Sequence, residues 1–178
     1  MFEVRLALGI EYDGTEWSGW QSQPSRNTVQ DHLEDALEKF SLEKVKVICA
    51  GRTDAGVHAK EQVVHFDTSL NRERHSWLRG INSFLPASIN VKWVRLVPSD
   101  FHARFSAKSR KYSYSILNQK VRSSLNRRFT TWIAVPLDHN RISDAAKLLL
   151  GVHDFSAFRS SECQAKSAVR KIININVE

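Results

Sequence analysis

An unbroken alternation of apolar residues near the N-terminus constrains the fold of this 178-residue chain more than any other feature. Side chains at every second position lie on one face of a β-strand, so this period predicts a strand that is buried on one side. The alternating residues are Val4, Leu6, Leu8, Ile10 and Tyr12. The chain is therefore expected to begin with a half-buried strand.

The segments that follow alternate between helical and strand periods. Thr28 is a candidate N-cap, with Asp31 three residues on and apolar residues at helical spacing from Val29 to Phe40. The further elements expected are a strand at 45–49, a strand at 62–67, a helix that Asn71 caps and Pro86 stops, and a strand at 91–97. The order βαββαβ predicts the α+β class, with a ferredoxin-like unit at residues 1–100 whose antiparallel sheet carries helices on one face.

A second unit with strands and one helix is expected at residues 101–178. Its expected elements are a strand at 112–116, a strand at 129–135, a helix at 142–149 that Asp138 or Asn140 caps and Gly151 closes, and a strand at 173–177. A second helix and a closing strand are missing from this series. The second α/β unit is therefore expected to be incomplete, with its C-terminal part missing.

Positive charge is concentrated in the second part of the chain. Residues 1–70 hold 7 basic and 12 acidic residues, whereas residues 71–178 hold 19 basic and 7 acidic residues. The stretch 104–128 has eight basic residues and no acidic residue, with three aromatic residues among them. It predicts a polyanionic partner, since Lys and Arg contacts to phosphate release counterions and supply most sequence-independent affinity. A solvated basic face that keeps the protein soluble is the alternative.

The cysteines and histidines show no pattern typical of a metal centre. Cys49 and Cys163 lie far apart without a C-x-x-C spacing, which favours a reducing cytoplasm and two small buried side chains. His58, His65 and His102 lack a carboxylate or cysteine to complete a ligand set, so we expect hydrogen-bonded structural histidines. No apolar run is long enough to cross a bilayer, and charges within the N-terminal pattern argue against a signal peptide.

The stretch CAGRTDAGVHA, residues 49–59, places reactive side chains in a loop between two expected strands. Gly51 and Gly56 can adopt backbone angles that other residues avoid, which permits a sharp turn and the close approach of a ligand. Between them, Arg52 and Asp54 could both face a bound phosphodiester. Phosphates repel a carboxylate, so an Asp54 that approaches a nucleic acid makes sense as an ionised nucleophile among cations. The alternative is that Asp54 only caps a turn.

Several motifs, in their order along the chain, resemble the tRNA pseudouridine synthase A family. They are GIEYDGTEWSGWQSQP (9–24), AGRTDAGVHA (50–59), QVVHFDT (62–68), FHARFSA (101–107), RKYSYSI (110–116) and DFSAFRSSECQAKS (154–167). The resemblance covers essentially the whole chain. It implies an isomerase that converts uridine to pseudouridine in the anticodon stem-loop of tRNA, at positions 38, 39 and 40. It also implies a cytoplasmic homodimer with tRNA as its partner, without a cofactor or a metal.

The resemblance also implies roles for individual residues. Asp54 matches the catalytic aspartate, whose carboxylate attacks the nucleoside at the ribose C1′ or at the base. Arg52 matches the arginine that fills the space of the flipped base and holds phosphate, and Tyr112 matches the tyrosine that packs on that base. The positions that match RNA-contacting residues are Arg72, Phe101, His102, Ala103, Arg104, Phe105, Glu162, Cys163, Gln164, Ala165 and Lys166. Arg104 and Lys166 are expected to bind phosphate.

The chain departs from the family pattern in two respects. Ala59 and Glu61 stand where glycines are usual, and Glu61 adds negative charge close to the expected path of the RNA. Family members also continue beyond this point, for most of another hundred residues. This difference in length agrees with the incomplete second unit and favours a truncated chain. A non-catalytic RNA-binding module and an inactive remnant are the alternative functions. The strands, however, lack the aromatic signature of a classical RNA-recognition motif.

Overall fold

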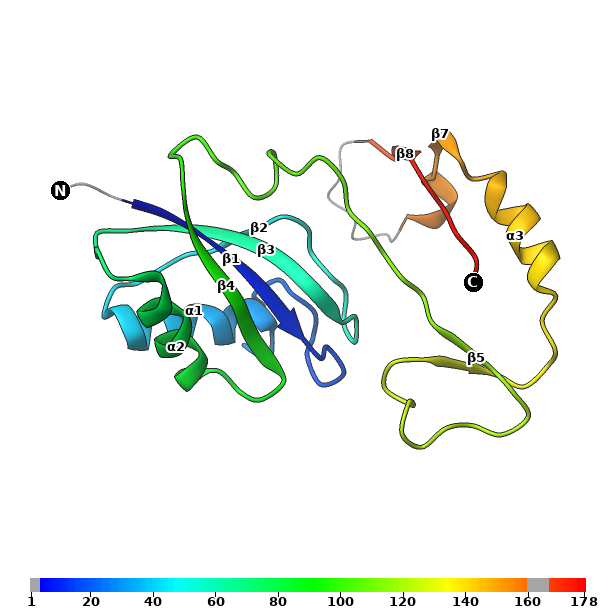
Figure 1. Ribbon diagram of the computed structural model, residues 1–178, viewed down its shortest axis with the longest axis horizontal. Helices are drawn as coiled ribbons and strands as arrows, with labels where there is room; N and C mark the ends of the chain where they lie inside the picture. The colour runs from blue at the N-terminus through cyan, green and yellow to red at the C-terminus, as the bar shows by residue number, and fades with distance from the viewer. Residues whose placement is uncertain (1–3, 160–166) are drawn as a thin grey trace. The chain divides into compact units, whose positions relative to one another are not determined.

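The first half of the chain forms a four-stranded antiparallel sheet in the computed structural model, which describes residues 4–159 and 167–178 (Figure 1). Its elements are β1 (Val4–Tyr12), α1 (Val29–Ser41), β2 (Ile48–Cys49), β3 (Ala59–Thr68), α2 (Arg74–Phe84) and β4 (Ile89–Val97). The strand order is β2-β3-β1-β4, so β3 lies between the two strands that α1 connects. This arrangement is the ferredoxin-like split βαβ layer, and it confirms the predicted fold class.

The apolar face of β1 and the apolar stripes of the two helices form one core. Leu8 and Ile10 are completely buried, as are Leu33 on α1 and Ile81 on α2. Trp77 of α2 packs edge-on against aromatic side chains of both α1 and β3, with ring centroids 5.1 Å from Phe40 and 5.6 Å from Phe66. The two helices therefore share one face of the sheet, as the alternation in β1 predicts.

Thr28 begins α1 as predicted, because its side-chain oxygen accepts the backbone N–H of Asp31 at 3.3 Å. The hydroxyl groups of Thr28 and Ser22 donate to the carboxylate of Asp31, at 2.5 and 2.7 Å. Burial raises the pKa of Asp31, but these hydrogen bonds outweigh it, so the pKa is lowered. The segment before α1 is thus fixed to the first turn of the helix.

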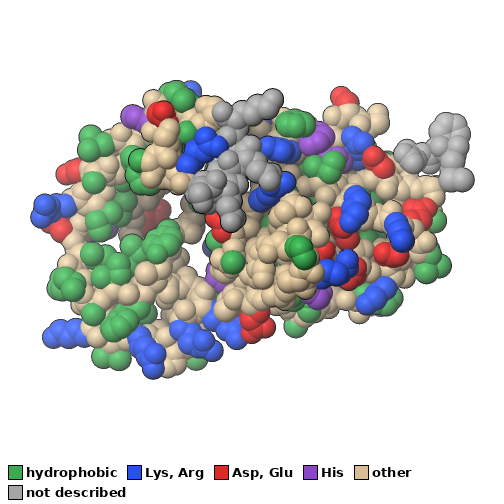
Figure 2. Space-filling model, turned by 180° about the vertical axis from the view of Figure 1, so that it is seen from behind, with side chains coloured by type: hydrophobic (Ala, Val, Ile, Leu, Met, Phe, Trp, Pro, Cys, Tyr) green, Lys and Arg blue, Asp and Glu red, His purple; other side chains and the backbone are tan. Residues whose placement is uncertain are grey.

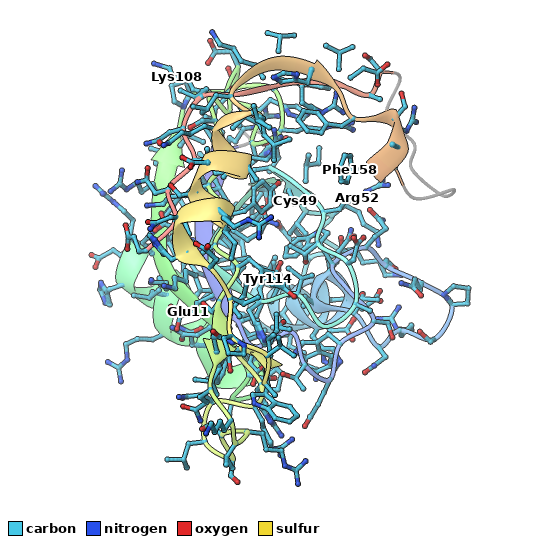
Figure 3. The ribbon with its side chains drawn as sticks, turned by 90° about the vertical axis from the view of Figure 1, so that its right-hand side faces the viewer. Glu11, Cys49, Arg52, Lys108, Tyr114 and Phe158 are labelled. Carbon is cyan, nitrogen blue, oxygen red and sulfur yellow. The ribbon has the colours of Figure 1, made fainter. Side chains whose placement is uncertain are left out.

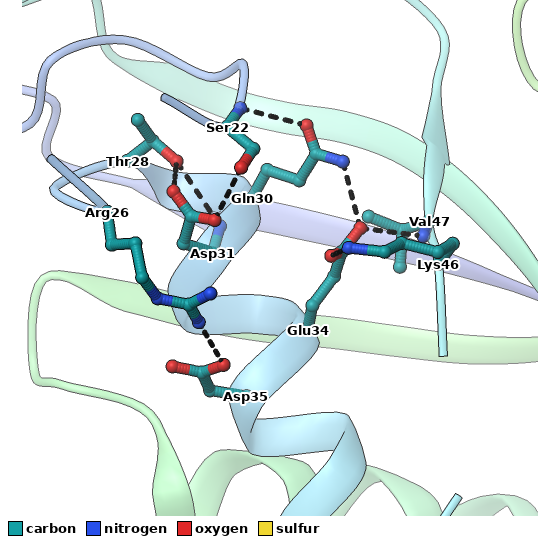
Figure 4. A network of polar contacts seen from close by, with 9 residues as sticks. All are labelled: Ser22, Arg26, Thr28, Gln30, Asp31, Glu34, Asp35, Lys46 and Val47. Carbon is teal, nitrogen blue, oxygen red and sulfur yellow. Dashed lines mark hydrogen bonds and ion pairs between the residues drawn. The ribbon is translucent and has the colours of Figure 1, made fainter. Parts of the chain in front are cut away.

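Glu34, one turn further along α1, fixes the segment that leads into β2 (Figure 4). Its carboxylate accepts hydrogen bonds from Gln30 at 2.8 Å, from Lys46 at 2.7 Å and from the backbone N–H of Val47 at 3.1 Å. Val47 is buried although the regular strand begins only at Ile48. The predicted strand at 45–49 is therefore shorter than expected, since a side chain of α1 takes the place of a strand partner.

The second helix starts later than predicted. Its N-cap is Glu73, which makes no side-chain capping bond, whereas Asn71 lies two residues before this cap and is exposed. The helix ends at Phe84, and Leu85 is extended, as expected for the residue before Pro86. The prediction of the helix and its C-terminal end is confirmed, and Asn71 as its cap is wrong.

The second part of the chain has short elements. They are β5 (Ile116–Asn118), β6 (Thr131–Ile133), α3 (His139–Lys147), β7 (Gly151–Asp154), the 3-10 turn η1 (Ser156–Phe158) and β8 (Val169–Ile172). Asp138 caps α3 by accepting the N–H of Arg141 at 3.0 Å, so Asn140 is not the cap. None of the described residues of 114–178 is buried.

Two predicted strands of this second part are absent. The segment 112–115 is not a strand, because pairing with β6 begins only where Ile116 faces Thr131. The segment 173–177 is not a strand either, since β7 offers four residues and its pairing with β8 ends at Ile172. Alternation alone predicted both, but a strand requires a partner.

The segment after β4 belongs to the first of two compact units, Met1–Ser113 and Tyr114–Glu178. Arg5 donates to both carboxylate oxygens of Asp67 at 2.7 Å, and to the carbonyl oxygens of Ser99 and Phe101 at 2.5 and 2.9 Å. The Nδ1 of His65 accepts the backbone N–H of Ala103 at 3.1 Å. These bonds hold residues 99–103 to the first unit, so the boundary lies later than residue 100.

No helix of the described residues is long and apolar enough to cross a membrane.

Candidate active site

The loop at residues 50–58 joins β2 to β3, and its base is held by Gln62. The N–H of Ala50 donates to the carbonyl of Val63 at 2.8 Å, which closes the hairpin. The side chain of Gln62 accepts the N–H of Gly51 at 3.3 Å and also donates to the carbonyl of Gly51. One nearly buried amide therefore satisfies both polar groups of Gly51 and fixes where the loop begins.

Asp54 lies at the tip of this loop with its carboxylate in solvent. The N–H of Val57 donates to the carbonyl of Asp54 at 3.2 Å, and Gly56, with φ +77°, is the third residue of this turn. The side chain of Asp54 is exposed and makes no hydrogen bond or ion pair with any residue that the structure describes. The backbone carbonyl of Asp54 closes this turn. The alternative that the side chain of Asp54 caps a turn is therefore not supported by a side-chain hydrogen bond.

A second loop, residues 13–27, supports the first one from beside it. Trp20 donates its backbone N–H to the carbonyl of Thr53 at 2.9 Å, and Gly56 donates to the carbonyl of Trp17 at 3.3 Å. The hydroxyl groups of Tyr12 and Thr53 lie 2.8 Å apart. Burial raises the pKa of Tyr12, so this phenol stays protonated and available as a hydrogen-bond donor or acceptor. The residues on both sides of Asp54 are thus fixed, although Asp54 itself is not.

Two glycines allow this contact between the loops, and sequence reasoning did not assign them a role. A Cβ added to Gly14 would lie 2.1 Å from the carbonyl oxygen of Val57. A Cβ added to Gly19 would lie 2.8 Å from the carbonyl oxygen of Thr53, and Gly19 also has φ +88°. The two glycines in the stretch EYDGTEWSGW could have indicated a close backbone contact. The sequence does not show which loop they contact, because residues 50–58 are distant along the chain.

Arginines gather around the base of the loop. Figure 3 marks Arg52 and Cys49 near each other where the chain leaves β2. Burial raises the pKa of the Cys49 thiol, while the positive charges of Arg52 and Arg104 act in the opposite direction, so both guanidinium groups lie within electrostatic range of this residue. Arg110 donates from its guanidinium group to the carbonyl of Ala50, with its Nε at 3.2 Å. The structure thus places Arg110, which is distant in sequence, beside the loop that holds Asp54.

Tyr112 follows Arg110 by two residues and is 77% exposed. Its segment is not the strand that we predicted at 112–116, and its ring is not packed into a core in the described part of the chain. Arg110 ties this segment to the start of the loop at Ala50. The site residues Arg52, Asp54 and Tyr112 therefore belong to neighbouring segments of the first unit.

The segment Phe101–Phe105 forms a turn that presents Arg104 to solvent. Ala103 is buried, and the Nδ1 of His102 accepts the backbone N–H groups of Arg104 and Phe105 at 3.2 and 3.3 Å. The rings of His102 and Phe105 stack with centroids 4.3 Å apart, and the guanidinium of Arg104 lies 5.7 Å from the Phe105 ring. Arg104 and the 76% exposed Phe105 are free to meet a phosphate and a base.

Arg72 lies at the other end of the sheet. It follows the last residue of β3, whereas the 50–58 loop precedes the first, and a ten-residue strand spans about 30 Å. Its guanidinium donates to the carbonyl of Phe40 at 3.3 Å and stacks 4.6 Å from the Phe40 ring. Arg72 and Asp54 therefore cannot contact the same nucleotide. Glu162, Cys163, Gln164, Ala165 and Lys166 lie outside the described residues.

The three histidines that we considered as metal ligands accept backbone hydrogen bonds, as expected of structural histidines. The N–H of Gly14 donates to Nδ1 of His58 at 3.0 Å, and His65 and His102 accept the bonds given above. Within residues 4–159 and 167–178 there is no group of three or more His, Cys, Asp or Glu side chains that could hold a metal ion.

Fold and site together define an α+β protein of the ferredoxin-like class, with an exposed carboxylate on a supported loop beside arginines. The chain belongs to the tRNA pseudouridine synthase family, whose model matches residues 9–106 and 145–178. This match includes the 50–58 loop and the Phe101–Phe105 segment, and it confirms the resemblance drawn from the motifs.

Curated relatives agree with this assignment. The chain is 54% identical to tRNA pseudouridine synthase A of Janthinobacterium sp. (strain Marseille) over 98% of its length and 66% of the relative. It is 54% identical to the protein of the same name from Herminiimonas arsenicoxydans, over 98% of this chain and 65% of the relative. Identity to that of Pseudoalteromonas atlantica is 51%, with 98% and 66% covered. The chain thus spans just under two thirds of the length of these relatives.

Proposed function

We propose that this chain isomerises uridine to pseudouridine in the anticodon stem-loop of tRNA, at positions 38, 39 and 40, with Asp54 as the nucleophile. The observation that carries the proposal is the Asp54 carboxylate, exposed and without a hydrogen-bonded partner among the described residues, at the tip of a loop held from both sides. Such a carboxylate is free to attack, and the fixed backbone around it limits where it can do so.

The proposed reaction consumes no co-substrate, because substrate and product are isomers, and the family resemblance implies no cofactor. A carboxylate oxygen of Asp54 attacks C1′ of the ribose and displaces uracil, whose N1 takes the electron pair of the broken glycosidic bond. The uracil turns so that its C5 faces C1′. The bond between C5 and C1′ then forms while the carboxylate leaves, C5 loses its proton to solvent, and N1 takes up a proton.

Arg52 and Tyr112 act on the nucleotide around this step. The target base must leave its helical stack, which costs a few kcal/mol. In our proposal the guanidinium of Arg52 occupies the vacated space and binds the neighbouring phosphate, for which its planar fork is suited. The exposed ring of Tyr112 packs on the flipped uracil, and its hydroxyl assists the departure of the C5 proton.

The remaining matched residues bind the rest of the RNA. We propose that the turn at Phe101–Phe105 contacts the stem-loop through Arg104, and that Arg72 binds phosphate at the far end of the sheet. Glu162–Lys166 supplies a further contact, with Lys166 on phosphate. We also propose that the protein works in the cytoplasm as a homodimer, as its family resemblance implies.

The test of this function is the release of tritium from an anticodon stem-loop that carries uridine labelled at C5. We expect release by the wild-type chain, and a loss of at least about a thousandfold in the Asp54→Asn variant, because the neutral amide cannot act as the nucleophile. RNA binding should persist in that variant, since an exposed side chain of the same size is kept.

Asp144→Asn is the matched control, because Asp144 is also exposed but lies on α3, where it forms an ion pair with Lys147. Its tritium release should equal that of the wild type. Binding of the stem-loop without release by the wild-type chain would refute the enzymatic proposal in favour of an RNA-binding module. Undiminished release by Asp54→Asn would refute the role of Asp54.

A further inference from the structure

We propose that the loop between β5 and β6 forms a second RNA-binding pocket, which holds one nucleotide of the tRNA by its phosphate and its base. The inference rests on the proposed function in one respect, namely that the ligand is RNA. The pocket has a volume of about 550 Å³, within the range of roughly 300–1,000 Å³ that small-molecule sites occupy. Its lining residues are Leu117, Arg122, Ser123, Ser124, Arg127, Thr130 and Trp132.

Uncompensated positive charge distinguishes this pocket. Arg122 and Arg127 are exposed, and neither forms an ion pair with a described residue of the chain. The sequence contains no Asp or Glu between Asp100 and Asp138 that could neutralise them locally. Figure 2 shows Lys and Arg side chains gathered along the edge that this loop occupies. Two unpaired guanidinium groups at one cavity are suited to a phosphate, which they can bind in bidentate fashion.

A second cavity, in the first unit, lacks this character. It has a volume of about 310 Å³ beside α2, and its lining includes Arg72 and Arg74 but also the carboxylate of Glu73 and five apolar residues. Its arginines therefore face a charge of opposite sign within the same cavity. The contrast indicates that arginines in a cavity are not sufficient for an anion site. The β5–β6 pocket has suitable electrostatics because no carboxylate is among its lining residues.

The floor of the pocket offers a surface for a base. Leu117 and Trp132 are paired across the two strands, so their side chains lie next to each other on the sheet. The indole N–H of Trp132 donates to the carbonyl of Gln119 at 2.9 Å, which fixes the ring, and the residue is 46% exposed. A fixed, half-exposed indole is a stacking platform, and stacking on aromatic rings is how proteins hold unpaired bases.

The wall of the pocket is built around Asn126. Its carbonyl accepts the N–H groups of Phe129 and Thr130 at 2.9 and 3.1 Å and the hydroxyl of Thr130 at 2.9 Å, and its own N–H donates to the hydroxyl oxygen of Ser123 at 3.1 Å. The hydroxyl groups of Ser123 and Ser124 donate no hydrogen bond to any residue that the structure describes, so their protons are available to phosphate or ribose oxygens. Guanidinium groups, hydroxyl groups and an aromatic face together match the three parts of a nucleotide in a loop of RNA.

The test compares tRNA binding by paired charge variants, measured as fluorescence anisotropy of a labelled, unmodified tRNA transcript between 50 and 200 mM KCl. The Arg122→Ala/Arg127→Ala variant should bind about tenfold or more weakly at 100 mM, and the slope of log K against log salt should become shallower by about two. The control variant Arg141→Ala/Lys147→Ala removes the same charge from exposed positions on α3 and should change affinity and slope far less.

A second pair of variants tests the stacking surface. Trp132→Phe keeps a flat ring and should retain binding within about threefold, whereas Trp132→Ala should lose about tenfold or more. Equal binding by the wild type and the Arg122→Ala/Arg127→Ala variant would refute nucleotide binding by this pocket. Equal losses of affinity in that variant and in the Arg141→Ala/Lys147→Ala control would refute it as well.

Failure of the pocket is distinguishable from failure of the proposed function. If the arginine variant loses affinity but the wild-type chain releases no tritium, the pocket stands and the enzymatic role fails. If the wild-type chain releases tritium and the arginine variant keeps full affinity, the role stands and the pocket fails. A wild-type chain that binds no tRNA at any of these salt concentrations would refute both.

Discussion

Gly19 shows how a residue without a side chain positions a residue whose side chain does the proposed chemistry. Its φ of +88° is unfavourable for other residues, and its Cα faces the carbonyl of Thr53, next to Asp54 in sequence. Any Cβ there would push the two loops apart. Gly56 also has a positive φ, but a Cβ at that position would meet nothing within 4 Å.

The two glycines therefore allow a matched experiment on stability. Gly56→Ala should cost about 1–2 kcal/mol of unfolding free energy, because only the left-handed backbone conformation is penalised. Gly19→Ala should cost about 1–3 kcal/mol more than that, since the added methyl group also clashes with the carbonyl of Thr53. Urea unfolding of both variants measures the difference, and equal losses would show that the contact between the loops is not rigid.

At the residue level, the sequence predicted which side chains would be presented but not what supports them. Arg52 and Asp54 were recognisable because two glycines enclose them in an expected loop. The clamp by Gln62 and the approach of Arg110 to Ala50 were not predictable, since each joins residues that are distant along the chain. We expected Glu61 to add negative charge near the path of the RNA. In the structure, its carboxylate accepts the indole N–H of Trp93 at 3.1 Å, so this side chain already has a partner within the sheet.

Among the elements, the segment Phe101–Phe105 depends on a histidine in β3. His65 is buried and must have an unprotonated Nδ1 to accept the N–H of Ala103. Burial lowers its pKa, and the nearby charges of Arg5 and His102 act in the same direction, against an opposite effect of Asp67. The turn that presents Arg104 is therefore fixed to the sheet through a neutral imidazole.

This arrangement predicts a pH dependence of stability. The folded-state pKa of His65 lies below its unfolded value near 6.5, so the unfolded chain takes up the proton first. The unfolding free energy should therefore fall as the pH falls below about 6.5 toward the lowered pKa, and this contribution should be constant above that range. Urea unfolding at a series of pH values between 5 and 8 measures it.

His65→Gln is the control for this pH dependence, because an amide oxygen can accept the bond from Ala103 but does not titrate. The variant should lose less stability than the wild type over the same range of pH. An identical pH profile for both proteins would contradict the proposed link between His65 and the segment. An NMR titration in which His65 protonates at or above pH 6.5 would contradict it as well.

The elements of the first unit were predictable because local signals and tertiary structure agree there. Thr28 caps α1 and Pro86 limits α2, and both signals depend on neighbours in sequence. The strands expected at 112–116 and 173–177 failed because a strand is defined by its partner, and partners are not encoded in a local period. The cap at Asn71 failed for a reason that the structure does not explain.

For the whole molecule, the contrast between the two units is one of burial. The first unit holds the entire set of buried apolar side chains among the described residues, whereas no described residue after Ser113 is buried. Exposed apolar side chains such as Leu125, Val135 and Phe158 are correspondingly frequent in the second unit. An ordered chain with little apolar burial has little to offset its conformational entropy.

The two units should therefore differ in resistance to proteolysis. Brief digestion of the native chain at low protease concentration should cut within residues 114–178 first and leave a resistant fragment that ends near Ser113. Mass spectrometry of the time course identifies the cuts. Trypsin is informative because both units contain many Lys and Arg residues, so site availability does not bias the result. Cleavage at equal rates on both sides of Ser113 would show that the second unit is as stable as the first.

The backbone contacts of Gly14 and Gly19 with the 50–58 loop also limit how this protein can be re-engineered. A chimera that transplants residues 50–58 into another scaffold would carry the proposed nucleophile but not the second loop that supports it. Residues 12–20 would have to be transferred together with it, so the smallest exchangeable module comprises two separate stretches of chain.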